Sequence, residues 1–93
     1  MDQEIDLIGS ALESVEQWEA AVRLYQRSVD INPLAEEHYR RLMNGLSKQN
    51  RYAEAIATYR RCRQTLSIVL GVEPKPSTRM LYEAIRSAQS KSL

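Results

Sequence analysis

Apolar residues recur along this chain at the spacings of amphipathic helices. The pattern is clearest between Arg51 and Gly71, where bulky or small apolar residues follow one another three or four positions apart. The residues of this stripe are Tyr52, Ala55, Ile56, Tyr59, Cys62 and Leu66. Gly71 is a residue type that commonly ends helices. The stretch therefore predicts a long helix that buries one face and continues to Leu70.

A degenerate copy of this stripe lies thirty-four residues upstream. Trp18, Ala21, Val22, Tyr25 and Ser28 fall opposite Tyr52, Ala55, Ile56, Tyr59 and Cys62, and Ile8 and Leu12 fall opposite Leu42 and Leu46. A period of thirty-four residues built from two helices is typical of tetratricopeptide repeats. The two alanines are small, which predicts close approach of helices at these points. The alternative is an ordinary pair of amphipathic hairpins, in which some such matches arise without a repeat.

The first forty-eight residues predict three helices. Ile5, Ile8, Leu12 and Val15 predict a helix at about 4–15 with these residues on its buried face, and with Asp6, Ser10 and Glu13 on its polar face. Gly9 lies inside this helix at a cost of about 1 kcal/mol relative to Ala, which indicates that a neighbouring helix needs the room. The following turn lacks glycine, so its bend falls to Ser14 or to a strained Glu16. The second helix is expected at 18–31, and Asn32-Pro33 both ends it and begins the third.

The C-terminal part predicts a covering helix after a short connector. Two prolines between Val72 and Pro76 favour extended backbone. Pro76 can begin a fifth helix, whose expected apolar face comprises Met80, Leu81, Ala84, Ile85 and Ala88. The predicted fold is an all-α, tetratricopeptide-like right-handed superhelix in one domain, 1–93, with antiparallel hairpins at 4–31 and 34–70 and a capping helix at 76–89.

Composition narrows the function classes. The chain has 93 residues, 13 Lys and Arg against 12 Asp and Glu, and a net charge of +1, so it carries neither a basic arm nor an acidic tail. It contains no apolar run long enough to span a membrane and no basic leader, and Cys62 is its only cysteine. A lone cysteine excludes an internal disulfide and fits a cytoplasmic protein.

Catalytic chemistry has little support in the residues. His38 is the only histidine, and we expect it to be a solvated surface residue. Cys62 falls opposite the small Ser28, which predicts a packed thiol. Gly9, Gly45 and Gly71 form no phosphate-binding pattern. We therefore expect no enzyme, no catalytic residue, no metal site and no cofactor.

The second hairpin and the connector resemble the bacterial transcriptional activator domain, the helical module of SARP-type regulators. The resemblance is carried by Arg41-Leu42-Met43, Leu46, Arg51-Tyr52-x-Glu54-Ala55, Tyr59-Arg60-Arg61, Leu66, Leu70-Gly71-Val72-Glu73-Pro74, Pro76-Ser77, Arg79 and Leu81-Tyr82-Glu83-x-Ile85. It implies an intracellular regulatory module that mediates oligomerisation or contacts with other domains or with transcription machinery. Because every predicted helix belongs to a hairpin or its cap, we expect the DNA-binding domain to lie outside this chain. We therefore expect the chain to be a fragment of a larger regulator.

Stacked hairpins offer a concave wall formed by the first helix of each pair. Transferring the tetratricopeptide groove positions gives a candidate protein-binding groove. Its members are Ser10, Glu13, Ser14, Arg40, Asn44, Ser47, Lys48, Arg79, Tyr82, Glu83 and Arg86. Arg40, Asn44 and Lys48 lie four residues apart, a stripe suited to a carboxylate or backbone carbonyl of a partner. The alternative is that these side chains are only solvated.

Three functional hypotheses follow. The first is a protein-interaction module of a transcription activator, which contacts itself, other domains or transcription machinery. The second is a scaffold domain of the same fold unrelated to transcription. The third is direct nucleic-acid binding through Arg60, Arg61 and Arg63, which the helix angle spreads around polar faces without exposed aromatic residues.

Overall fold

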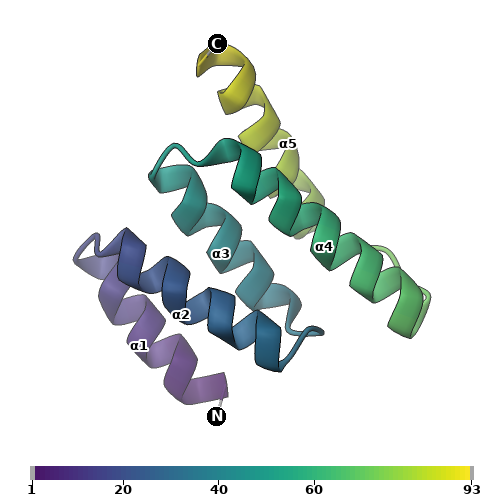
Figure 1. The fold of residues 1–93 in the computed structure, drawn as a ribbon, viewed down its shortest axis with the longest axis horizontal. Helices are drawn as coiled ribbons and strands as arrows, with labels where there is room; N and C mark the ends of the chain where they lie inside the picture. Colours follow the sequence, from purple (N-terminus) through teal and green to yellow (C-terminus); the bar gives the residue numbers. More distant parts are fainter. Residues whose placement is uncertain (1, 93) are drawn as a thin grey trace.

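A computed structural model describes residues 2–92 as five helices connected by short turns, with no strand in that range. The helices are α1 (Asp2–Ser14), α2 (Trp18–Ile31), α3 (Glu36–Lys48), α4 (Tyr52–Leu70) and α5 (Pro76–Ser92). Figure 1 shows α1 with α2 and α3 with α4 as neighbouring antiparallel hairpins, and α5 behind α4. The all-α prediction is confirmed, and the molecule is a slab of 38 × 37 × 18 Å. The right-handed superhelix stays a prediction.

Burial follows the thirty-four-residue pattern in the second helix of each hairpin. Ala21 and Ala55 are both 0% exposed, and Tyr25 and Tyr59 are both buried beside them. The other core side chains are Val22, Val29, Tyr39, Leu42, Met43, Leu46, Ile56, Cys62, Leu66 and Ile85. The two alanines lie in the core, and the close approach of helices at these points stays a prediction.

Helix α1 is rotated relative to the predicted face. Ile8 and Val15 are 53% and 64% exposed, so their assignment to the buried face is wrong, whereas Ile5 and Leu12 pack partly against the core. The buried side of α1 is centred near Gly9, where an added Cβ would lie 1.9 Å from the Tyr25 hydroxyl oxygen. Gly9 therefore provides the room that the sequence indicated. The rotation of α1 about its own axis is set by the polar residues Asp6 and Glu13, which have hydrogen-bond partners inside the molecule.

The turns use three residues with left-handed backbone. Glu16 and Asn50 have φ values of 58° and 59°, and Gly71 has 65° at the end of α4. The strained Glu16 was one of two predicted sources of the first bend. The start of α3 differs from the prediction, because the helix begins at Glu36 and not at Pro33. Residues 32–35 form a turn in which the Ala35 amide donates to the Asn32 carbonyl at 3.1 Å.

Helix α5 covers the second hairpin through a narrower face than predicted. Thr78 and Ile85 are buried, and the Tyr82 ring stacks on Tyr59 with centroids 4.0 Å apart. Met80 and Ala84 are exposed, so their assignment to the covering face is wrong. The reason is the buried Thr78 hydroxyl, which bonds to α3 and thereby fixes the rotation of α5.

Candidate functional site: the groove along α3

The centre of the molecule is α3, which packs against α2, α4 and α5. On its remaining side the structure has a hollow of about 260 Å³. The hollow is lined by Glu37, Arg40, Arg41, Asn44 and, from α5, Leu81. We call this set the α3 groove.

Arg41 connects one wall of the α3 groove to α1 and α2. Its guanidinium donates to the Tyr25 hydroxyl at 2.9 Å and to the Ser10 hydroxyl at 3.2 Å, and it lies 3.9 Å from the Glu13 carboxylate. The Tyr25 hydroxyl donates in turn to Glu13 at 2.5 Å. Burial, together with this bond to Glu13, raises the pKa of Tyr25 to about 12. The neutral Tyr25 hydroxyl thus donates to Glu13 and accepts from Arg41, and so orders both side chains.

Arg40 connects the other wall to α5. Its guanidinium donates to the Thr78 hydroxyl at 2.9 Å and lies 3.7 Å from Glu36. The Thr78 hydroxyl and the Lys75 amide both donate to the Glu36 carboxylate, at 2.6 and 2.7 Å. Because Arg40 and Arg41 both face carboxylates of the domain itself, the groove is polar without an uncompensated positive charge.

The structure brings four of the predicted groove residues to this place. Arg40 and Asn44 line the hollow, and Ser10 and Glu13 meet its wall at Arg41. Sequence reasoning missed Arg41, Glu37 and Leu81. The adjacent pair Arg40-Arg41 was the available signal, but which partners each would meet depended on the rotation of α1 and α5.

The remaining predicted residues lie elsewhere. Ser14 is exposed at the end of α1, and Ser47 is half-buried. Lys48 lies over the Trp18 ring, 5.8 Å from its centroid. On α5, Tyr82 is held against Tyr59. Glu83 and Arg86 form an exposed ion pair at 4.0 Å, and Arg79 is exposed.

His38 is not a surface residue, so that prediction is wrong. It is 3% exposed, with one ring nitrogen 2.5 Å from the Ser28 hydroxyl and the other 2.8 Å from Asp6. These contacts join α1, α2 and α3. The Ser, His and Asp side chains resemble a hydrolytic constellation, but Ser28 is itself buried and offers no open position to a substrate. The contacts are structural.

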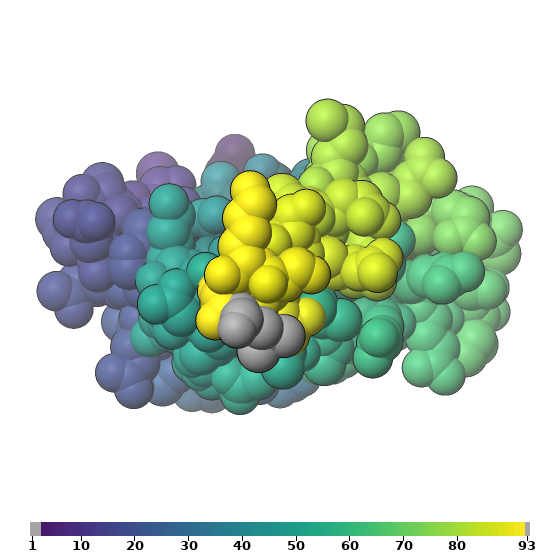
Figure 2. Space-filling model, turned by 90° about the horizontal axis from the view of Figure 1, so that it is seen from above, coloured from purple at the N-terminus to yellow at the C-terminus, as the bar shows by residue number. Residues whose placement is uncertain are grey.

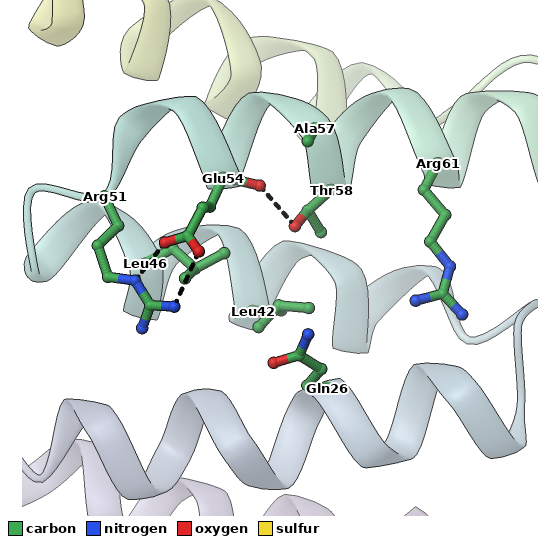
Figure 3. A pocket seen from close by; sticks show the side chains of 8 residues that line it. All are labelled: Gln26, Leu42, Leu46, Arg51, Glu54, Ala57, Thr58 and Arg61. Atoms are coloured by element: carbon green, nitrogen blue, oxygen red, sulfur yellow. Dashed lines mark hydrogen bonds and ion pairs between the residues drawn. The ribbon is translucent and has the colours of Figure 1, made fainter.

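A second hollow of about 270 Å³ lies on the opposite side of α3, between α2 and α4 (Figure 3). Its apolar floor is Leu42 and Leu46. Its arginines are paired: Arg51, the residue before α4, with Glu54, and Arg61 with Asp30 at 2.9 Å. The hollow was not predicted because the groove transferred from repeat proteins is formed by the first helices, whereas this one lies between the second helices.

The residues that line the two hollows include no histidine and no cysteine. Among residues 3–92, the side chains form no group of three His, Cys, Asp or Glu that could hold a metal ion. Cys62 is fully buried, and burial raises the pKa of its thiol to about 12, which confirms the packed thiol. None of the helices in the described part of the chain has the length and apolarity needed to span a membrane.

Two antiparallel hairpins and a covering helix define an all-helical module. The chain belongs to the family of bacterial transcriptional activator domains, whose family model matches residues 4–86. Its relatives include the transcriptional regulatory protein MoaR1 of Mycobacterium tuberculosis and of Mycobacterium bovis, each 38% identical over 60 residues. That alignment covers 64% of this chain and 19% of each relative, so the chain spans about a fifth of their length. No solved structure matches the chain. The family belongs to transcription regulation and is not an enzyme family.

Proposed function

We propose that the domain is the protein-interaction module of a bacterial transcription activator and that its α3 groove receives an extended segment of a protein partner. The partner is another domain of the regulator or a component of the transcription machinery. DNA is contacted by a domain outside this chain, and the module acts in the cytoplasm by stoichiometric binding without a cofactor. The family match and the transcriptional regulatory relatives support this role in a transcription activator.

The observation that carries the proposal is the position of Asn44. Its half-buried side chain lines the hollow from the C-terminal half of α3, together with Arg40, Arg41 and the apolar Leu81. A side-chain amide both donates and accepts hydrogen bonds, so it can pair with the N–H and C=O groups of an extended backbone. Leu81 supplies apolar contact for one side chain of such a segment. Arg40 and Arg41 are held in place by their own partners, which reduces the entropy lost on binding.

Site-specific photocrosslinking tests this proposal. A photoreactive phenylalanine analogue at Asn44 should crosslink the regulator's partner in cells. The same residue at Thr58, in the hollow on the opposite side of α3, serves as the matched control. Adducts from position 44 and not from position 58 support the α3 groove. Adducts from 58 alone, or no protein adduct from 44, would reject it.

Binding affinity provides a second readout. Once the crosslinked protein is known, Asn44→Ala should weaken its binding about tenfold or more, since two buried hydrogen bonds are lost. Unfolding of the variant domain should be almost unchanged, because Asn44 lies outside the core. Equal affinity of variant and wild type would contradict the assigned role.

A further inference from the structure

Helix α1 is the element that the hydrophobic core holds least. Among residues 3–92, each of α2, α3, α4 and α5 contributes at least one side chain to the buried core, whereas α1 contributes none. Within residues 3–14 only Gly9 is buried, and Ile5 and Leu12 pack half-buried against the core. Figures 1 and 2 show the N-terminal hairpin at one edge of the molecule, so α1 packs against the domain on one side only. Burial of apolar surface therefore contributes less to the docking of α1 than to that of the other helices.

Polar contacts supply much of the docking of α1. Three of its side chains each bond to a side chain of α2 or α3, and they are Asp6, Ser10 and Glu13. Water replaces such partners when the helix leaves, so the net stabilisation from each bond is modest. The last turn of α1 also holds the acidic Glu13 and no basic residue, which the helix dipole disfavours. Helix α1 is thus docked through contacts that cost little to exchange for water.

The turn that joins α1 to α2 is strained. Glu16 has φ of 58°, and its counterpart thirty-four residues later is Asn50, with φ of 59°. The two turns share a backbone bond, because the Glu16 and Asn50 amides donate to the carbonyls of Glu13 and Ser47 at 3.0 and 2.9 Å. Asparagine adopts the left-handed region several-fold more readily than most residues with a Cβ. The first hairpin therefore holds backbone strain that the second reduces, and this strain favours opening of the first turn.

Undocking of α1 would remove one wall of the α3 groove. Arg41 lines this groove and contacts Ser10 and Glu13 of α1. It also donates to the Tyr25 hydroxyl, which Glu13 in turn holds in place. Once α1 leaves, the carboxylate that remains to Arg41 is that of Glu37, 3.6 Å away and 55% exposed, and exposed pairs of this kind are weak. The guanidinium then loses the fixed position that favours binding in the groove.

We propose that α1 is a switch for the α3 groove: it undocks as a unit while the other helices stay folded, and the groove binds its partner only while α1 is docked. Opening of one unit at a lower cost than global unfolding is expected where buried apolar contacts are few. By linkage, a segment that binds the docked state also holds α1 in place. The undocking is independent of the function proposed above, whereas its effect on binding rests on that function.

Amide hydrogen exchange, followed by NMR at increasing urea concentrations, tests the undocking. The amides from Leu7 to Ser14 should exchange about a hundredfold faster than those in the middle of α3 and α4, with one shared and shallow urea dependence. Fraying from the N-terminus would instead leave the amides nearest Ser14 protected. Exchange of α1 at the rate and urea dependence of α3 and α4, or a graded loss of protection from its first residue, would overturn the proposal.

Substitutions on α1 and in its turn separate docking from helix propensity. Asp6→Ala should speed the exchange of α1 about tenfold, because the bond to His38 is lost, and should leave α3 and α4 unchanged. Glu4→Ala removes an exposed acid from the same helix and is the matched control, with a change under about threefold. Glu16→Asn should slow the exchange about threefold, because the strained turn receives the residue type of its counterpart. Equal effects of Asp6→Ala and Glu4→Ala on α1 would contradict docking through Asp6.

Photocrosslinking from Asn44 tests the effect on the groove. Gly9→Ala should prevent docking, because the new Cβ would overlap the Tyr25 hydroxyl, and should lower the adduct yield about fivefold or more. Ala11→Gly, on the exposed side of α1, is the control and should crosslink like the wild type. Full yield from the Gly9→Ala variant would overturn the switch and leave the proposed function standing. No adduct in the wild type would reject the proposed function, and with it the effect on binding, while hydrogen exchange still decides whether α1 undocks.

Discussion

Replacing Gly9 by alanine should have two opposite effects on the stability of the domain. On an exposed helix, Gly→Ala stabilises by about 1 kcal/mol. In this domain, the new Cβ would lie 1.9 Å from the Tyr25 hydroxyl oxygen and 2.5 Å from its Cζ. The Tyr25 ring is fully buried, and its hydroxyl is held by Glu13 and Arg41, so it has no free space into which to move.

The expected loss of stability follows from the strain and the lost hydrogen bond that result when the Tyr25 side chain must move. Overpacking costs about 1–3 kcal/mol, and the loss of one hydrogen bond to a charged group adds about 1.5–3 kcal/mol. After the helical gain is subtracted, Gly9→Ala should destabilise the domain by about 2–5 kcal/mol, out of a total near 5–15 kcal/mol. For a domain of this size, the melting temperature should fall by about 8 °C or more.

Thermal and urea unfolding followed by circular dichroism measure this change. Ala11→Gly, on the exposed side of the same helix, provides the reference for helix propensity and should cost about 1 kcal/mol. In a Tyr25→Phe background the nearest clashing atom is gone, so Gly9→Ala should cost less than in the wild type. A melting temperature that is unchanged or raised by Gly9→Ala would refute the close approach of α1 to Tyr25.

Three further predictions concern the core. Tyr59→Ala should cost about 3–5 kcal/mol in urea unfolding, because it opens a cavity and removes the ring on which Tyr82 stacks; a small loss would show that Tyr59 is not core. His38→Ala should cost about 2–4 kcal/mol, since Ser28 loses its buried partner, whereas a surface histidine would cost under about 0.5 kcal/mol. The pKa values of Tyr25 and Cys62 are raised from 10.0 and 9.0 to about 12, so the folded state keeps protons that the unfolded chain releases. Stability should be intact below about pH 9 and fall as pH rises from 9 to 12, and constant unfolding midpoints over that window would contradict the burial of both groups.

The sequence by itself determined the helices and much of the core. Period and spacing placed α2 and α4, because a helix that buries one face must repeat apolar residues every three or four positions. The small Ala21 and Ala55 indicated where helices meet, and Gly71 indicated where α4 ends. The family resemblance also came from local motifs, above all the connector Leu70–Pro74. These features depend on neighbours along the chain and are readable without a tertiary structure.

Only the tertiary structure decided the rotation of the outer helices and, with it, the sites. Helix α1 has an apolar and a polar side, and hydrophobicity alone favoured burying Ile8. Partners on other helices made the polar side the inner one, because Asp6 reaches His38 and Glu13 reaches Tyr25. In the same way, Thr78 fixed α5 by bonding to Glu36. Bonds between residues more than ten positions apart leave no periodic signal, so neither the partners of Arg40 and Arg41 nor the exposure of Ile8 on α1 followed from the sequence.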